Sequence, residues 1–435
     1  MKLSLALATS LSLAVLSLAA CGGSSPKSSS GNTLATLTLT STTGKTAPVQ
    51  PGGSAGSCHA VIARTIGEVA ARIYQEARHG DNVAQAVGRV KGSTALRKAI
   101  SSGDTDATEA ALRALLVNQI VRIEIRKGGQ RFASVGSGAA IAPVSGVLPG
   151  TDARFVLSTQ AASAYAAVTR QVTGADTLLW GLSGGQVVGA QPGAPLAALL
   201  HDRPITLRGR RYQSISTTGE AYPSGLLHIA MLVPTDGLSC PGSAAQTRVE
   251  TLGRIGERIY QEELHSSYVL ATLRHIEADR PFLQAVAARD SAAIRAAIVG
   301  LFAAHIHVVR VHVNAVEPSG AQRFLYDLGG PYVLAPVHGS VRSAGKLVGR
   351  FSFAIQDDAG YLKLAHLFTG AQVLMRVGGT QVMGTLDPGP AHVPDRGPLD
   401  YRGQRYEAYS FSGTAFPSGT LRISLLLPGT AGSGG

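Results

Sequence analysis

The chain has little of what enzymes usually show in their sequences. Its 435 residues include three cysteines and one tryptophan, and aromatic residues make up 5% of the chain. We find no H-E-x-x-H zinc motif, no phosphate-binding glycine loop and no cysteine in the setting of a nucleophile. The Gly-rich stretch GLSGGQ, at 181–186, joins two expected strands and opens no helix. We therefore expect no enzymatic activity and no cofactor.

Histidines at metal-binding spacing are also lacking. His305, His307 and His312 are close in the sequence, but on a strand His312 falls on the face opposite to the other two. No cysteine or carboxylate lies nearby at the spacing of a zinc ligand. We expect edge-strand or surface histidines here and no metal site.

Acidic residues are scarce relative to basic ones. The chain has 27 Asp and Glu against 39 Lys and Arg, which gives a net charge of +12 and a pI near 9.8. The basic residues are scattered, without a long basic run and without interleaved aromatics on which bases could stack. We expect no nucleic-acid partner. A basic surface beside a membrane is better suited to anionic lipids or wall polymers.

Long apolar runs are confined to the N-terminus. Residues 1–20 carry Lys2, a short apolar run and then small residues, which is the pattern of a signal peptide. The sequence Leu-Ala-Ala-Cys that ends at Cys21 resembles the bacterial lipobox, which implies cleavage before Cys21 and a lipid on its sulfur. Residues 21–57, rich in Ser, Thr and Gly, should form a disordered tether. The expected location is therefore the cell membrane, lipid-anchored on the extracytoplasmic face, with no cytoplasmic part; a secreted protein with an incidental cysteine is the alternative.

The two remaining cysteines are Cys58 and Cys240. Outside the cell such a pair is usually bonded, and these two flank the segment 59–239. A disulfide between them would clamp the start of that segment to its end, with a stabilisation of roughly 4–5 kcal/mol in the chain-entropy view. Two free thiols are the alternative.

An internal repeat organises the rest of the chain. The sequence ARIYQE at 71–76 returns as ERIYQE at 257–262, and RGRRYQS at 208–214 returns as RGQRYEA at 402–408. The offset between copies changes only slightly along the chain, as a duplicated domain with loop insertions predicts. We expect a first domain at 58–240, a second at 241–430 and a flexible tail at 431–435.

Each copy places helices first and strands afterwards. Ile62, Ile66, Val69 and Ile73 recur at helical spacing, whereas HIHVVRVHVNAV, at 305–316, is β-branched and alternating. This order predicts an α+β fold: two tandem domains, each with a long N-terminal helix and an antiparallel sheet of about five or six strands.

Two stretches of the second copy carry a resemblance to a known family. FLYDLGGPYVLAPV at 324–337 and LVGRFSFAIQDDAGYLKLAHLFTG at 347–370, after a long helix, resemble the Cache family of extracytoplasmic PAS-like sensor domains. The resemblance covers about residues 250–428 and, more faintly, 60–234. It implies a small-molecule pocket between the sheet and its loops. Cache domains usually lie between two membrane-spanning helices of a receptor, whereas this chain has an expected lipid anchor and no output module.

The candidate ligand-binding residues lie in these stretches. Asp357 and Asp358 follow a strand, so they either start a helix or, near Tyr361, bind an amine or other cationic ligand. The first copy has Ala161 and Ala162 at these positions and can cap its helix with Ser158 or Thr159 instead. We expect the ligand in the second domain, and a smaller, less polar pocket in the first. The full candidate set is Tyr326, Asp327, Tyr332, Arg350, Asp357, Asp358 and Tyr361.

These observations predict a lipid-anchored, extracellular ligand-binding sensor component. Its partners would be an unknown small molecule, the membrane and a membrane-spanning protein that carries the signal. The alternative is a structural or adhesive envelope lipoprotein without a ligand, and a hydrolase of wall material is a more distant one.

Overall fold

The computed structural model describes residues 58–116, 119–181, 188–189, 196–238, 242–304 and 307–429. The predicted signal peptide, tether and tail lie outside the described residues, as do Cys21, Cys240 and His305. The lipid anchor and the Cys58–Cys240 disulfide therefore stay predictions.

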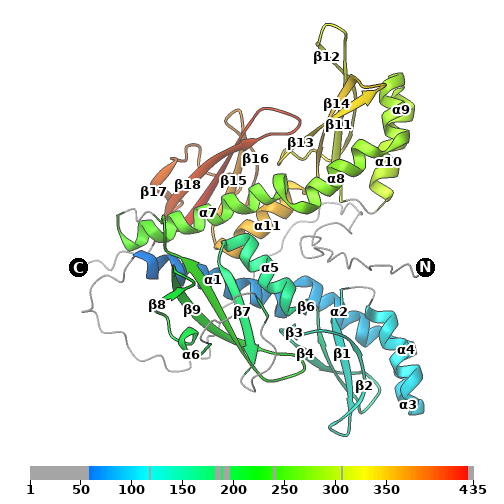
Figure 1. Ribbon diagram of the computed structural model, residues 1–435, viewed down its shortest axis with the longest axis vertical. Helices are drawn as coiled ribbons and strands as arrows, with labels where there is room; N and C mark the ends of the chain where they lie inside the picture. The colour runs from blue at the N-terminus through cyan, green and yellow to red at the C-terminus, as the bar shows by residue number, and fades with distance from the viewer. Residues whose placement is uncertain are drawn as a thin grey trace.

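The first unit begins with four helices and continues with two antiparallel sheets (Figure 1). The helices are α1 (Cys58–His79), α2 (Asp81–Gly92), α3 (Thr94–Ser102) and α4 (Thr105–Leu116). The outer sheet has the strand order β2-β1-β5-β4, with β1 (Arg122–Lys127), β2 (Gln130–Gly136), β4 (Val144–Val147) and β5 (Arg154–Ser158). After the small pair β3 (Ala140–Ile141) and β6 (Gln160–Ala161) and helix α5 (Ala162–Thr173), the inner sheet has the order β7-β10-β9-β8, with β7 (Asp176–Gly181), β8 (Pro204–Leu207), β9 (Arg210–Glu220) and β10 (Leu226–Pro234). A single turn, α6 (Leu196–Leu199), lies beside this sheet.

The second unit repeats this plan. Its helices are α7 (Ala244–His265), α8 (Ser267–Ala278), α9 (Arg280–Ala288) and α10 (Ser291–Ala303). Its outer sheet has the order β12-β11-β14-β13, with β11 (Arg310–Val316), β12 (Gln322–Gly329), β13 (Val337–Ser343) and β14 (Lys346–Ala354). Helix α11 (Asp358–Thr369) leads to an inner sheet of order β16-β15-β19-β18-β17, with β15 (Gln372–Val377), β16 (Thr380–Gly384), β17 (Arg396–Tyr401), β18 (Gln404–Thr414) and β19 (Thr420–Pro428).

The predicted α+β class with antiparallel sheets is confirmed. Each unit differs from the prediction in having two sheets of four or five strands, where one sheet of five or six was expected. The change of sheet occurs around the short helix in mid-unit. Strands β5 and β14, before α5 and α11, lie inside the outer sheets, whereas β7 and β15, after these helices, belong to the inner sheets.

Each outer sheet is covered by helices on one face. Residues alternate between buried and partly exposed along β11, so that Val311, Val313 and Ala315 share one face of the strand. This face packs on α8, α9 and α10 in one apolar cluster, and α2, α3 and α4 form the equivalent cluster of the first unit. The other face of each outer sheet carries mostly polar side chains, such as Glu124 and Arg126 in the first unit and His312 and Asp327 in the second, and we call it the open face.

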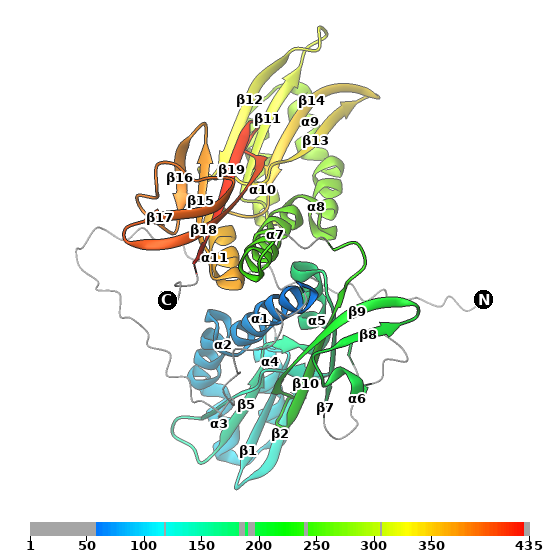
Figure 2. The same cartoon turned by 90° about the vertical axis from the view of Figure 1, so that its left-hand side faces the viewer.

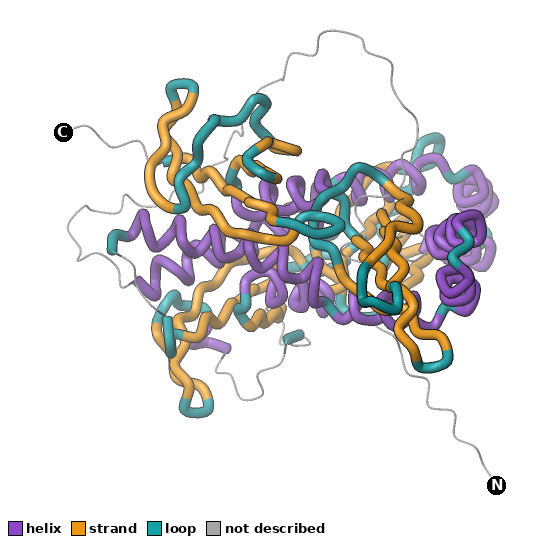
Figure 3. Tube along the Cα trace, turned by 90° about the horizontal axis from the view of Figure 1, so that it is seen from above, coloured by secondary structure: helices purple, strands orange, loops and turns teal. Residues whose placement is uncertain are grey.

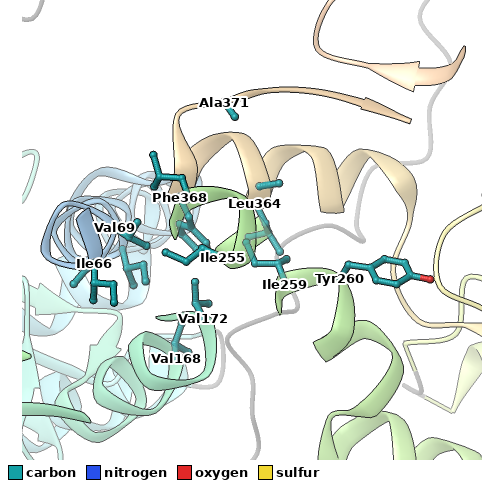
Figure 4. Close-up of a cluster of buried hydrophobic side chains, with 14 of the residues drawn as sticks. Ile66, Val69, Val168, Val172, Ile255, Ile259, Tyr260, Leu364, Phe368 and Ala371 are labelled. Atoms are coloured by element: carbon teal, nitrogen blue, oxygen red, sulfur yellow. The ribbon is translucent and has the colours of Figure 1, made fainter. Parts of the chain in front are cut away.

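The inner sheets enclose a core that belongs to both units. Helices α1, α5, α7 and α11 pack together between the two inner sheets, as Figures 1 and 2 show. Seen from above, in Figure 3, helices run through the middle with strands on both sides. Val69, Val172, Ile255 and Phe368 come from these four helices and meet in one buried cluster (Figure 4). The two units therefore share a single hydrophobic core.

Matching tyrosines fix the helices in both units. Tyr165 donates a hydrogen bond to the Ala70 carbonyl oxygen at 2.9 Å, and Tyr361 donates one to the Gly256 carbonyl oxygen at 3.0 Å. Each bond joins the short mid-unit helix to the long first helix of the same unit. Because the bond occurs in both copies, it belongs to the repeated framework.

Candidate functional site

The structure places the seven predicted ligand residues in several different settings. Tyr326 lies on the helix-covered face of the second outer sheet, where it packs against the apolar cluster. Asp327 lies on the opposite, open face, and Arg350 is exposed on that same face. Tyr332 lies in the following loop, where its carbonyl oxygen accepts a hydrogen bond from Arg310 at 2.8 Å.

Asp357 and Asp358 both have structural partners. Asp357 is the N-cap of α11, and its carboxylate accepts a hydrogen bond from the Gly360 amide at 2.6 Å. Asp358 is 3% exposed and accepts from the amides of Val333 and Leu334, each at 3.0 Å. Burial raises the pKa of Asp358, although these amide bonds act in the opposite direction. The pair starts the helix and also fixes the loop before β13.

The expected caps of the first copy are not found. Helix α5 has Ala161 at its N-cap without a side-chain bond. The Ser158 hydroxyl instead donates to the Ile141 carbonyl oxygen at 2.5 Å and accepts from the Gln160 amide at 3.2 Å. Ser158 thus ties β5 to the small β3–β6 pair, which is why it does not cap the helix.

Tyr361 is fully buried in the shared core. Its hydroxyl already donates to Gly256, so the ring stands between α11 and α7. Burial raises the pKa of this phenol well above its usual range. A ligand would need to open the core to reach it.

The open face of the second outer sheet carries polar groups that satisfy one another. Arg310 and Asp327 form a two-pronged ion pair with both distances at 2.9 Å, and the Nδ1 atom of His312 lies 3.1 Å from Asp327. Burial acts to raise the pKa of Asp327, but the bonds from Arg310 and His312 outweigh it and the pKa lies below its usual value. His338 and Ser352 form a further pair at 2.8 Å. This face therefore leaves little polar capacity for a ligand.

The open face of the first outer sheet is hollowed into a cavity. The cavity has a volume of about 600 Å³, and none of the seven predicted residues lines it. It was expected in the second unit, with a smaller and less polar counterpart here. Its wall combines the end of α1, strands β4 and β5, the β1–β2 turn and the turn after β9. The lining residues are Arg78, His79, Arg126, Gly128, Gly129, Pro143, Val144, Ser145, Asp152, Arg154, Val156, Glu220, Pro223 and Ser224.

Ion pairs account for most of the charge at this cavity. Arg78 lies 3.3 Å from Glu220. Arg126 lies 2.5 Å from Glu124, whose side chain is 5% exposed. Lys127, beside the β1–β2 turn, lies 3.8 Å from Asp152. Arg154 is exposed and forms no ion pair with any residue that the structure describes.

Equivalent contacts hold the two open faces in place. The Arg122 guanidinium lies 4.8 Å from the Tyr222 ring, and the Arg310 guanidinium lies 4.5 Å from the Phe416 ring. Each arginine belongs to an outer sheet and each ring to the turn that ends β9 or β18, so the pair joins the two sheets of one unit. In the first unit, this turn also provides Pro223 and Ser224 to the cavity.

The sequence pattern pointed to the second copy and not to this cavity. The Tyr and Asp residues of the second copy stood out, whereas Arg126 and Arg154 were treated as part of a scattered basic background. The signal was present in the alternation of β1, where Arg122, Glu124 and Arg126 occupy one face of the strand. Pairing of β1 with β5 then brings Arg126 opposite Arg154, which needs the three-dimensional register.

The described ranges offer neither a metal-binding cluster nor a helix that could cross a bilayer. We find no group of three or more His, Cys, Asp or Glu side chains there that could hold a metal ion. The helices of the same ranges include none that is both long and apolar enough to cross a bilayer.

Comparisons with known proteins give only remote likenesses. No family model and no curated protein matches the chain. Among solved structures, the periplasmic domain of Vibrio cholerae LuxQ is similar over 41% of this chain and 99% of its own length, with 12% identity and a TM-score of 0.28. An extracellular ligand binding receptor from Desulfohalobium retbaense is similar over 52% of this chain and 47% of its own, with 13% identity and a TM-score of 0.26. Likenesses this distant assign neither a family nor a function.

Proposed function

We propose that the chain is an extracytoplasmic, lipid-anchored ligand-binding component of a sensor. The observation that carries the proposal is the cavity of about 600 Å³ on the first open face, where Arg154 has no ionic partner among the described residues. A concave site of this size, which combines charged and polar groups with an apolar part, can bind a small molecule. The ligand would occupy the first unit, and the second unit would complete the shared core.

The anchor and the signal require further partners. Cys21 would carry the lipid, and a membrane-spanning protein would pass the signal on. We expect a Cys21→Ala variant to lose lipid labelling and to appear in the medium. If it stays in the membrane fraction, another anchor holds the protein.

A ligand screen tests the binding function. Amino acids, carboxylates, amines and purines would be added to the full-length protein in a thermal-shift assay, since a ligand that binds the folded state raises the apparent stability. We expect one class to give a saturable shift that Ser145→Tyr abolishes, because Ser145 lies on the cavity wall.

The matched control is Ser340→Tyr on the edge strand β13 of the second unit, which should keep the shift. A screen without any saturable response would instead favour the structural or adhesive alternative.

A further inference from the structure

We infer that the cavity binds a small organic acid, with Arg154 as the anchor of its carboxylate. This inference rests on the proposed function and adds the chemical class of the ligand.

Three arginines stand in a row across the first outer sheet. Arg131 on β2 pairs with Arg126 on β1, and Arg126 pairs with Arg154 on β5. Like charges directly opposite one another on neighbouring strands destabilise a sheet. A bound anion beside the row would relieve this repulsion.

The second unit does not repeat the row. Asn314 on β11 stands between Phe324 on β12 and Arg350 on β14. Arg350 is therefore the only arginine in the equivalent row, and the polar groups around Asp327 are already paired. The repeat thus provides a matched face that keeps the fold and lacks the arginine row.

One arginine at the cavity remains outside the ion pairs that join the other charged side chains. Glu220, Glu124 and Asp152 each have their own partner in Arg78, Arg126 and Lys127. Of the three arginines that line the cavity, Arg78 and Arg126 are thus paired, whereas Arg154 forms no ion pair with a described residue. One surplus positive charge fits a ligand with one negative charge, and an arginine guanidinium matches a carboxylate with two parallel hydrogen bonds.

The rest of the wall fits an organic body. Pro143, Val144, Val156 and Pro223 give the cavity an apolar part, and Ser145 and Ser224 add hydroxyl groups. An inorganic anion would leave this apolar surface and most of the 600 Å³ in contact with water alone. A monocarboxylate with an aliphatic or aromatic body uses both parts of the wall.

Matched probe series test the ligand class on the full-length protein. Phenylacetate, indole-3-acetate and hexanoate would each be compared with the corresponding amide and amine by ligand-observed NMR titration at neutral pH. We expect the acids to bind in a saturable manner and the amides and amines to bind at least roughly tenfold more weakly. Arg154→Gln should weaken acid binding by roughly ten- to a hundredfold, as expected for the loss of a charged hydrogen-bond partner.

Arg350→Gln is the matched control, because Arg350 is also exposed, on the open face of the second outer sheet. This substitution should leave acid binding unchanged. Acid binding that survives Arg154→Gln but is lost in Arg350→Gln would overturn the inference. Binding of amides or amines that Ser145→Tyr abolishes and Arg154→Gln leaves intact would overturn the acid class while keeping the proposed function. If no member of the three series binds, the acid class is overturned, and the broader thermal-shift screen decides on the proposed function.

Discussion

At the scale of single residues, Asp358 lies at a helix start and also binds a loop that is distant in the sequence. Two aspartates after a strand predict a helix start, and Asp357 does cap α11. Asp358, one position further, is buried and accepts bonds from two amides of a loop 24 or 25 residues earlier in the chain. Sequence spacing gives no sign of such a long-range bond, so a ligand site was a reasonable hypothesis for this carboxylate.

Two substitutions of Asp358 distinguish the contribution of its charge to stability from that of its hydrogen bonds. Asp358→Ala would leave the Val333 and Leu334 amides without their acceptor, and we expect a loss of about 2–4 kcal/mol in the free energy of unfolding. Asp358→Asn keeps one acceptor oxygen for both amides and should stay within about 1 kcal/mol of the wild type. Chemical denaturation of the three proteins measures both values. Equal stability of Asp358→Ala and wild type would show that these bonds do not support the loop.

Glu263 gives the molecule a pH-dependent stability. It is 3% exposed at the end of α7, and its Oε1 atom has no hydrogen-bond partner among the described residues. Burial raises its pKa from 4.5 to about 8, and Glu262 and Asp357 add to the shift. The folded chain keeps a proton between these two values that the unfolded chain has lost, so the free energy of unfolding falls as the pH rises through this window.

We therefore expect Glu263→Gln to flatten this decline. The gain in stability should be on the order of 3–5 kcal/mol at pH 9 and close to zero near pH 4. Denaturation curves recorded from pH 4 to pH 9 give the comparison, with Glu277→Gln as the control, because Glu277 is exposed on α8 and is not among the groups that raise the pKa of Glu263. An unchanged slope in Glu263→Gln would show that this carboxyl does not hold the proton.

At the scale of elements, the long helices of one unit support the short helices of the other. Arg72 on α1 donates a hydrogen bond to the Phe368 carbonyl oxygen at 3.0 Å, at the C-terminal end of α11. Arg258, its counterpart on α7, lies against Gly174 at the end of α5. A cation at a helix C-terminus satisfies a free carbonyl and interacts favourably with the helix dipole.

A substitution of Arg72, in the first unit, should therefore destabilise helix α11 in the second unit. We expect Arg72→Ala to lower the free energy of unfolding by about 1–2 kcal/mol and to speed amide hydrogen exchange at the end of α11. Arg64→Ala, on the exposed side of the same helix, should change stability by about 0.5 kcal/mol or less. Equal effects of the two substitutions would argue that the cap has no energetic role.

Much of the secondary structure could be predicted from the sequence. The spacing of Ile62, Ile66, Val69 and Ile73 predicts α1, and all four are buried as expected. The alternation of β11 likewise predicts its buried face. The division of each unit into two sheets could not be predicted from the sequence. Which strands pair depends on how α5 and α11 pack in three dimensions, and the residue pattern does not show this. The cavity depends on the same register, which is why the sequence pattern did not point to this part of the first unit.

At the scale of the whole molecule, the two repeated units are joined by a shared central core, and each outer sheet keeps an apolar cluster of its own. The cluster that includes Val69, Val172, Ile255 and Phe368 draws on both units, so neither unit buries its central helices alone. Tandem domains with separate cores would unfold independently. Here we expect a single cooperative transition.

The only tryptophan of the chain makes this expectation measurable. Trp180 lies in β7 of the first unit and is 7% exposed, so its fluorescence reports on that unit, whereas circular dichroism reports on the whole chain. The two denaturation curves should coincide. Phe368→Ala, in the second unit, should shift both by a loss of about 3–5 kcal/mol. If Phe368→Ala left the denaturation curve of Trp180 fluorescence unchanged, the two units would unfold separately.

The central claim is that the first unit, and not the second, holds the ligand. Hydrogen exchange of the full-length protein, with and without saturating amounts of the organic acid that binds most tightly in the probe series, tests it most directly. The account predicts added protection in the segments that line the cavity, at 78–79, 126–129, 143–156 and 220–224. Protection confined to 324–352, around the open face of the second outer sheet, would contradict it.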